Sequence, residues 1–123
     1  MATHTMGNWS DGEKIYLDMD GDVSNQFPFF PQLHEKYDPV KGAGRVLRVR
    51  VDLARDKVHE YDYEWAYPGL QGALARQDDR YHTVPYRYGF LNGLAFGPDS
   101  TSKWHMIDHQ TGKVRSYDPG PGV

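Results

Sequence analysis

The amino-acid sequence predicts an all-β fold, organised as about two consecutive blades of a β-propeller. Three observations carry this prediction. Aromatic residues are abundant, with nine Tyr, five Phe and three Trp, and such side chains suit the pleated surface of short strands. Segments of alternating polarity are separated by turn residues. A two-strand pattern also recurs 56 residues later in the chain, which is typical of successive propeller blades.

Two segments show the period-two alternation of a half-buried strand most clearly. Residues 14–19 place apolar side chains at every second position, and residues 45–53 alternate Leu and Val with Arg and Asp. Four further segments rich in aromatic and β-branched residues are also predicted to be strands. They are residues 58–63, 86–91, 104–108 and 114–118.

The sequence offers one helix candidate and one long loop. Residues 70–76 are rich in Leu and Ala and predict a short helix, although Gly72 interrupts it. Residues 21–44 are rich in Pro and aromatic residues and are predicted to form a long loop. Loops of that length inside a compact domain are commonly functional.

The internal repeat aligns residues 51–62 with residues 107–118 without gaps. Each copy predicts a strand, a polar turn and a second strand, with the turn at residues 55–56 in the first copy and 111–112 in the second. An isolated pair of blades would expose unpaired strand edges and apolar faces. We therefore expect a fragment, a partial propeller domain over residues 1–123, that is partly disordered or self-associating when alone.

Composition narrows the possible partners. The formal charge is −3, from 14 basic and 17 acidic residues, which argues against a nucleic-acid or anionic membrane partner. The absence of cysteine excludes disulfides and thiolate metal sites. No apolar run approaches the roughly 18 residues of a membrane span, and the N-terminal segment lacks a signal-peptide pattern. The expected location is cytoplasmic, and the sequence leaves the oligomeric state open.

Histidines are the candidate metal ligands. His105 and His109 are four residues apart, but they flank a strand end and a turn, so a self-contained pair on a helix is not expected. His34 and His82 are predicted to lie in surface loops, and His59 on a solvated strand. His4 differs from these through its sequence context, residues 3–12 (THTMGNWSDG), followed by the predicted strand.

Five motifs follow one another along nearly the whole chain. They are residues 3–12 with residues 14–18 (KIYLD), residues 27–31 (FPFFP), residues 47–53 (LRVRVDL), residues 78–81 (DDRY) with residues 85–90 (PYRYGF), and residues 107–112 (IDHQTG) with Tyr117 and residues 120–122. In this order they resemble segments of the carotenoid cleavage oxygenase family, especially its lignostilbene dioxygenase-type members. The fourth motif is the most specific.

The resemblance implies a seven-bladed propeller with Fe(II) on its axis, held by four histidines, an all-neutral ligand set that suits this metal. Such enzymes use O2 to cleave a conjugated carbon–carbon double bond of a carotenoid or stilbene into two carbonyl products. The implied partners are therefore a small hydrophobic alkene and O2. His4 matches the third iron histidine, and the segments of the other three have no counterpart here. One imidazole does not hold iron alone, so the isolated chain is expected to be inactive.

The resemblance also marks a candidate substrate pocket. Phe27, Phe29 and Phe30 match an aromatic loop of the lignostilbene branch, and they are candidates for a pocket wall against a planar substrate. Ordinary packing of a Pro-rich loop against the propeller is the alternative interpretation.

The sequence departs from the family at Ala73. Family members commonly carry E-F-P-R-I before the DDRY motif, and the Glu accepts a ring N–H from an iron histidine. Residues 73–77 here are ALARQ, so either the alignment shifts locally or one histidine loses its carboxylate partner. Glu64 could replace the missing Glu only if the loop at Pro68 and Gly69 folds back.

The charged residues around the fourth motif are predicted to be structural. Arg and Asp side chains buried in a propeller need partners, and they find them in bidentate pairs. We therefore expect them to form buried ion pairs between blades rather than substrate contacts. These residues are Arg76, Asp78, Asp79, Arg80 and Arg87.

Three functional hypotheses follow from the sequence. The first is part of an Fe(II) dioxygenase, favoured by His4. The second is a non-catalytic binding module that has lost its iron, favoured by Ala73. The third is a small β domain that binds a sugar or peptide through exposed tyrosines, and the ordered motifs argue against it.

Overall fold

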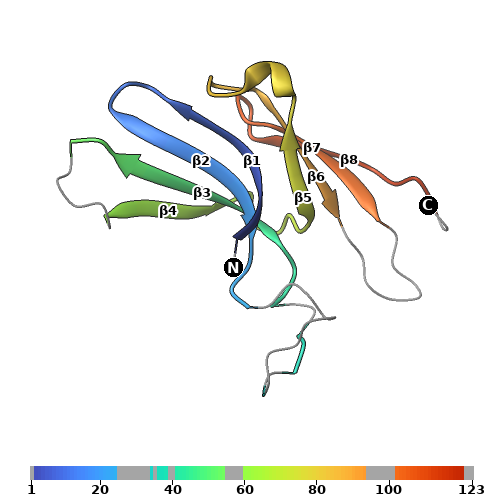
Figure 1. The fold of residues 1–123 in the computed structure, drawn as a ribbon. Coiled ribbons are helices and arrows are strands. Elements are labelled where there is room, and N and C mark those ends of the chain that lie inside the picture. The colour runs from blue at the N-terminus through green and yellow to red at the C-terminus, as the bar shows by residue number, and fades with distance from the viewer. Residues whose placement is uncertain are drawn as a thin grey trace.

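The computed structural model describes residues 2–24, 34, 36–38, 41–54, 60–93 and 102–120. Within them the chain forms two antiparallel four-stranded sheets (Figure 1). The first sheet contains β1 (Ala2–Ser10), β2 (Lys14–Gly21), β3 (Arg45–Asp52) and β4 (Tyr61–Ala66). The second contains β5 (Ala73–Gln77), β6 (Tyr88–Gly93), β7 (Lys103–Asp108) and β8 (Lys113–Tyr117), and the 3₁₀ helix η1 (Asp79–Tyr81) follows β5.

Each sheet is a simple meander, because its strands pair in the order of the sequence. Two such sheets packed face to face confirm the predicted all-β fold and its two blades. All six predicted strands are present with small shifts at their ends. Half of the predicted loop at residues 21–44, including residues 25–33, lies outside the described residues. Among the residues described, no helix is long and apolar enough to cross a membrane.

The predicted helix at residues 70–76 is wrong, because residues 73–77 form strand β5. The N–H of Gly72 donates to the carbonyl of Gly44 at 2.8 Å, and this contact ties the start of β5 to the first sheet. β5 then pairs with β6 and packs against β1. Ala73, Ala75 and Gln77 are buried in alternation, so tertiary packing overrides a weak helix propensity.

The repeat predicted from the sequence corresponds to equivalent hairpins. Its first copy runs from the end of β3 to the start of β4, and its second runs from the end of β7 through β8; these are the third and fourth strands of their sheets. In the second copy Gly112 has φ 71° and its N–H donates to the Asp108 carbonyl at 2.8 Å, which confirms the predicted turn. The turn at residues 55–56 lies outside the described part of the chain.

The core lies between the two sheets. It is formed by Met6, Val46, Ala75, Tyr86, Leu91 and Ile107. In β3 the fully buried residue is Val46, and Arg48 shares its face. Leu47 and Val49 lie on the opposite face and are only partly buried. The alternation in this strand is therefore as predicted, but the second sheet covers the face that carries arginine.

Candidate functional site

His4 lies on β1 beside a buried carboxylate. Its backbone N–H donates to Asp20 Oδ1 at 2.8 Å, and its Nδ1 is 3.3 Å from Asp20 Oδ2. The antiparallel register of β1 and β2 makes the two residues Cα partners. The Thr3 hydroxyl also donates to Asp20 Oδ2, at 2.8 Å. The Asp20 side chain is 0% exposed, whereas that of His4 is 43% exposed.

An open cleft of about 520 Å³ lies beside His4. Its lining comes from β1 and β5: Thr3, His4, Thr5, Leu74, Ala75 and Arg76. Leu74 has φ 56° at an irregularity where β5 shifts its register against β6. The residue is 46% exposed. A bulky residue at positive φ is strained, and strain of this kind concentrates at functional sites.

His4 has the features of one metal ligand, and only one. Metal-binding histidines commonly donate one ring N–H to a carboxylate, which fixes the ring and leaves the other nitrogen for the metal. Asp20 is placed for that contact, and the ring borders an open cleft. Among the described residues no group of three or more His, Cys, Asp or Glu could hold a metal ion. The described part of the chain therefore offers His4 as a single candidate ligand and contains no complete metal site.

The predicted alternative carboxylate, Glu64, does not reach His4. Glu64 lies on β4, at the opposite end of the strand order from β1, and it pairs with Arg50 Nη1 at 3.3 Å. Sequence reasoning missed Asp20, although its position on the strand that follows the His4 motif could have indicated it. The predicted pocket residues Phe27, Phe29 and Phe30 lie outside the described residues.

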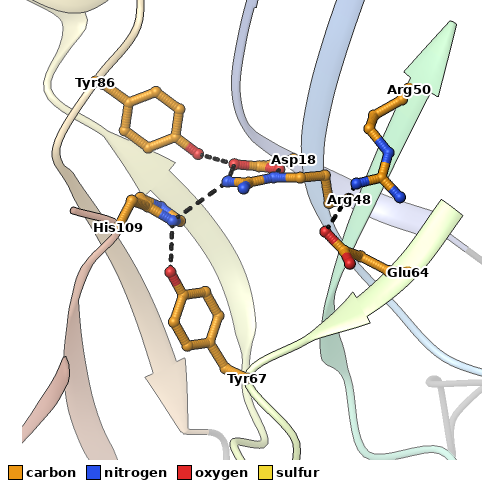
Figure 2. Close-up of polar contacts among 7 residues, drawn as sticks. All are labelled: Asp18, Arg48, Arg50, Glu64, Tyr67, Tyr86 and His109. Carbon is orange, nitrogen blue, oxygen red and sulfur yellow. Dashed lines mark hydrogen bonds and ion pairs between the residues drawn. The ribbon is translucent and has the colours of Figure 1, made fainter. Parts of the chain in front are cut away.

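Five polar residues form a second constellation, which we term the inter-sheet cluster: Asp18, Arg48, Tyr67, Tyr86 and His109 (Figure 2). Asp18 accepts two hydrogen bonds from Arg48, from Nε at 2.7 Å and Nη2 at 2.8 Å. It also accepts one from the Tyr86 hydroxyl at 2.6 Å. His109 Nδ1 lies 2.8 Å from Tyr67 Oη and 3.4 Å from Arg48 Nη2. The cluster thus links both sheets and the segment that connects them.

Burial and the contacts with Asp18 and Arg48 shift the pKa values of the inter-sheet cluster. The hydrogen bonds to Asp18 raise the pKa of Arg48, and burial with the neighbouring Asp18 charge raises the pKa of Tyr86. Burial, with a contribution from the Arg48 cation, lowers the pKa of His109. Because arginine can only donate, the 3.4 Å contact with Arg48 Nη2 favours His109 Nδ1 as the acceptor. The cluster is therefore a structural joint between blades.

The predicted ion pairs form, but their predicted location is wrong. Arg76 pairs with Asp79 at 3.4 Å, and Arg80 pairs with Asp78; both pairs lie at the surface around η1. Arg87 pairs with Asp108 at 2.8 Å within the second sheet. The buried pair is instead Asp18 with Arg48, which are strand neighbours within the first sheet, and the second sheet covers the face they share.

The other described histidines carry no metal site. His82 is exposed as predicted and lies 3.3 Å from Asp79 Oδ1, and His34 is also exposed. His105 Nδ1 lies 2.8 Å from the Ser116 hydroxyl. His105 and His109 lie on a strand and in the turn after it, which confirms that they are not a helical pair. His59 lies outside the described part of the chain.

The two meander sheets and the joint between them define this chain as part of a β-propeller. A scan against protein-family models found no match. Among curated proteins, it is 32% identical to lignostilbene-alpha,beta-dioxygenase isozyme III of Sphingomonas paucimobilis, over 98% of this chain and 27% of that protein. It is also 31% identical to isoeugenol monooxygenase of Pseudomonas putida, over 63% of this chain and 17% of that protein.

Solved structures show the same fold. Cobalt-substituted apocarotenoid oxygenase from Synechocystis matches with a TM-score of 0.73 at 15% identity, over 98% of this chain and 25% of that one. Substituted forms of the same enzyme give TM-scores of 0.71 and 0.72. The chain belongs to the carotenoid cleavage oxygenase family, with lignostilbene-type relatives. It spans about a quarter of the length of the relatives it matches.

Proposed function

We propose that this chain forms part of an Fe(II)-dependent dioxygenase that cleaves a conjugated carbon–carbon double bond of a stilbene-like or carotenoid substrate. The alkene and O2 together give two carbonyl products, so no further oxidant is needed. The observation that carries the proposal is the ring of His4, which borders an open cleft and has a buried carboxylate beside Nδ1. The family relationship to oxygenases supports it.

The residues of this chain would serve the reaction by holding Fe(II) and by shaping the substrate pocket. His4 would offer one imidazole to Fe(II), with the remaining ligands supplied from outside the described residues. When bound, the iron supplies activation of O2 beside the alkene. Leu74 gives the cleft an apolar wall, and Phe27, Phe29 and Phe30 are proposed to line the same pocket. An apolar, largely dry pocket would orient one double bond for attack.

A hybrid enzyme tests this function. Residues 2–120 replace the matching segment of the Sphingomonas lignostilbene dioxygenase, and the purified hybrid is assayed for conversion of a hydroxystilbene into two aldehydes. We expect turnover by the hybrid and loss of turnover in its His4→Ala form. A folded, iron-loaded hybrid that cleaves neither stilbenes nor apocarotenoids would overturn the proposal.

The second candidate is a non-catalytic propeller module that has lost its iron. Ala73 favours this function, because no carboxylate stands at the position where family members carry Glu. The contact between His4 and Asp20 favours the enzyme instead. The iron content of the folded hybrid distinguishes the two functions. The hybrid contains iron if the chain is part of an enzyme, and it lacks iron if the chain is a non-catalytic module.

The enzyme function implies a small hydrophobic alkene and O2 as partners. The absence of a nucleic-acid partner and a cytoplasmic location stay predictions from the sequence. The oligomeric state is addressed by a measurement proposed below.

A further inference from the structure

Asp20 is held by contacts that fix both of its carboxylate oxygens. Oδ1 accepts the backbone N–H of His4 at 2.8 Å. Oδ2 accepts the Thr3 hydroxyl at 2.8 Å and lies 3.3 Å from His4 Nδ1. The side chain is fully buried. A carboxylate anchored by a backbone donor and a hydroxyl cannot rotate away from the imidazole, so the contact with Nδ1 is set by the strand pairing itself.

This contact determines which ring nitrogen of His4 carries the proton. An ionised carboxylate only accepts hydrogen bonds. The neutral imidazole therefore satisfies Asp20 only when Nδ1 bears the hydrogen, and Nε2 then keeps its lone pair. A lone pair on Nε2 is the state that a metal ligand needs.

Ala73, the residue at which this sequence departs from the family pattern, carries no side-chain acceptor. Its methyl group is buried on β5. Asp20 instead comes from β2, the neighbour of His4 within the same sheet.

We propose that Asp20 is the positioning residue for His4: it holds the imidazole as the Nδ1–H tautomer and keeps Nε2 available to Fe(II). The role toward Fe(II) rests on the proposed function, whereas the tautomer of His4 depends only on its contact with Asp20. It predicts an effect on the tautomer in the absence of any metal.

The test compares His4 tautomers in the 123-residue chain by long-range ¹H–¹⁵N NMR of ¹⁵N-histidine-labelled protein. Spectra are recorded at about pH 9, where imidazoles are neutral, and His4→Gln assigns the signals. We expect Nδ1–H in the wild-type chain. In Asp20→Asn the side-chain amide keeps an acceptor for the His4 backbone N–H and presents an N–H donor to Nδ1, so the ring should change to Nε2–H.

Thr3→Val is the matched control. It removes a hydrogen bond to the same carboxylate but leaves the acceptor beside Nδ1, so the tautomer should stay Nδ1–H. Circular dichroism checks that each variant folds. An Nε2–H ring in the wild-type chain would overturn the proposal whatever the variants do, and so would an unchanged tautomer in folded Asp20→Asn.

An iron measurement on the hybrid enzyme separates this proposal from the function. Loss of a carboxylate partner of this kind weakens metal binding about 10- to 100-fold, so Asp20→Asn should lower Fe(II) affinity by that factor and Thr3→Val should not. Equal affinity in all three hybrids would overturn the role of Asp20. A wild-type hybrid without iron would refute the proposed function, while the tautomer result would still stand or fall on its own.

Discussion

Asp18 and Arg48 bring opposite charges into the interface between the two sheets. The Asp18 side chain is fully buried and that of Arg48 is 23% exposed. Tyr86 donates a further hydrogen bond to the same carboxylate. Charges buried this way stabilise a structure only as a matched set, because removing one partner leaves the other uncompensated.

We predict that Asp18→Asn lowers the free energy of unfolding by about 3 kcal/mol, the usual effect of breaking a buried ion pair from one side. Arg80→Gln is the control, since it breaks the exposed pair with Asp78 and should change stability little. Chemical denaturation of the three proteins measures both effects. If Asp18→Asn were as mild as Arg80→Gln, the inter-sheet cluster would not hold the blades together.

His109 makes stability depend on pH. Its pKa is lowered in the folded chain, first by burial and also by the Arg48 cation, against the opposing effect of Asp18 and Asp108. Tyr67 and Tyr86 also face the ring. The unfolded ring therefore takes up its proton first on acidification. The neutral His109 ring therefore contributes its full share of folding stability above the ordinary histidine pKa of about 6.5, and this share is lost as pH falls below it.

We predict that acidification from about pH 8 to about pH 5.5 lowers Tm more in the wild-type chain than in His109→Asn. The asparagine keeps an acceptor for Tyr67 and Arg48 but does not titrate. The other histidines are common to both proteins, so the difference isolates His109. Parallel pH profiles would show that this ring does not control the joint.

Strand β5 shows why the sequence pattern can fail to predict a strand. Its Ala and Leu residues favour a helix, and only pairing with β6 and packing on β1 make it a strand. β1 was also missed as a strand, since its residues lack a clear alternation. The strands with strong alternation, β2 and β3, were predicted with nearly correct ends. The local sequence pattern therefore predicts strands whose polar and apolar residues alternate clearly. It does not predict strands that form only because of tertiary contacts.

The residues of the candidate site also fall into those that a local motif predicts and those that only the fold brings together. The sequence motif identified His4, because its context lies within a few neighbouring residues. Asp20 is 16 residues away, and His109 and Arg48 are separated by 61 residues. Contacts at such separations depend on strand register and sheet stacking, which no local pattern contains. The charged residues near η1 were wrongly predicted to pair between blades for the same reason. Their residue types indicate that they form ion pairs, but whether those pairs are buried depends on how the sheets stack.

The irregularity in β5 gives a prediction at Leu74. Glycine adopts positive φ without the strain that leucine meets there, and the exposed leucine loses little burial when truncated. We expect Leu74→Gly to leave the free energy of unfolding unchanged or to raise it by up to about 1 kcal/mol. Leu91→Ala in the core is the contrast, with a loss of about 2–5 kcal/mol. A comparable loss in Leu74→Gly would mean that the backbone at β5 is not strained.

The outer faces of the two sheets present apolar side chains to solvent. Large exposed aromatic residues on them include Tyr61, Tyr63, Phe90, Trp104 and Tyr117. The terminal strands β4 and β8 are also sheet edges, and exposed edges and apolar patches promote association. We expect the isolated chain to self-associate, with an apparent mass in analytical ultracentrifugation that rises with concentration.

A charged variant serves as the control for this association. Phe90→Lys with Trp104→Lys places like charges on the outer face of the second sheet, so it should shift the protein towards monomer. A wild-type monomer at all concentrations, with one sharp unfolding transition, would show that the two blades are stable without further cover.

The central proposal is that His4 supplies one ligand to an iron centre whose other ligands lie outside the described residues. The direct measurement is the iron content of three purified proteins: the 123-residue chain, the hybrid enzyme and its His4→Ala form. The account predicts almost no iron in the isolated chain, about one iron per hybrid and strong loss in the His4→Ala hybrid, because metal sites fail when a ligand is removed. Iron retained by a folded His4→Ala hybrid, or about one iron held by the isolated chain, would contradict it.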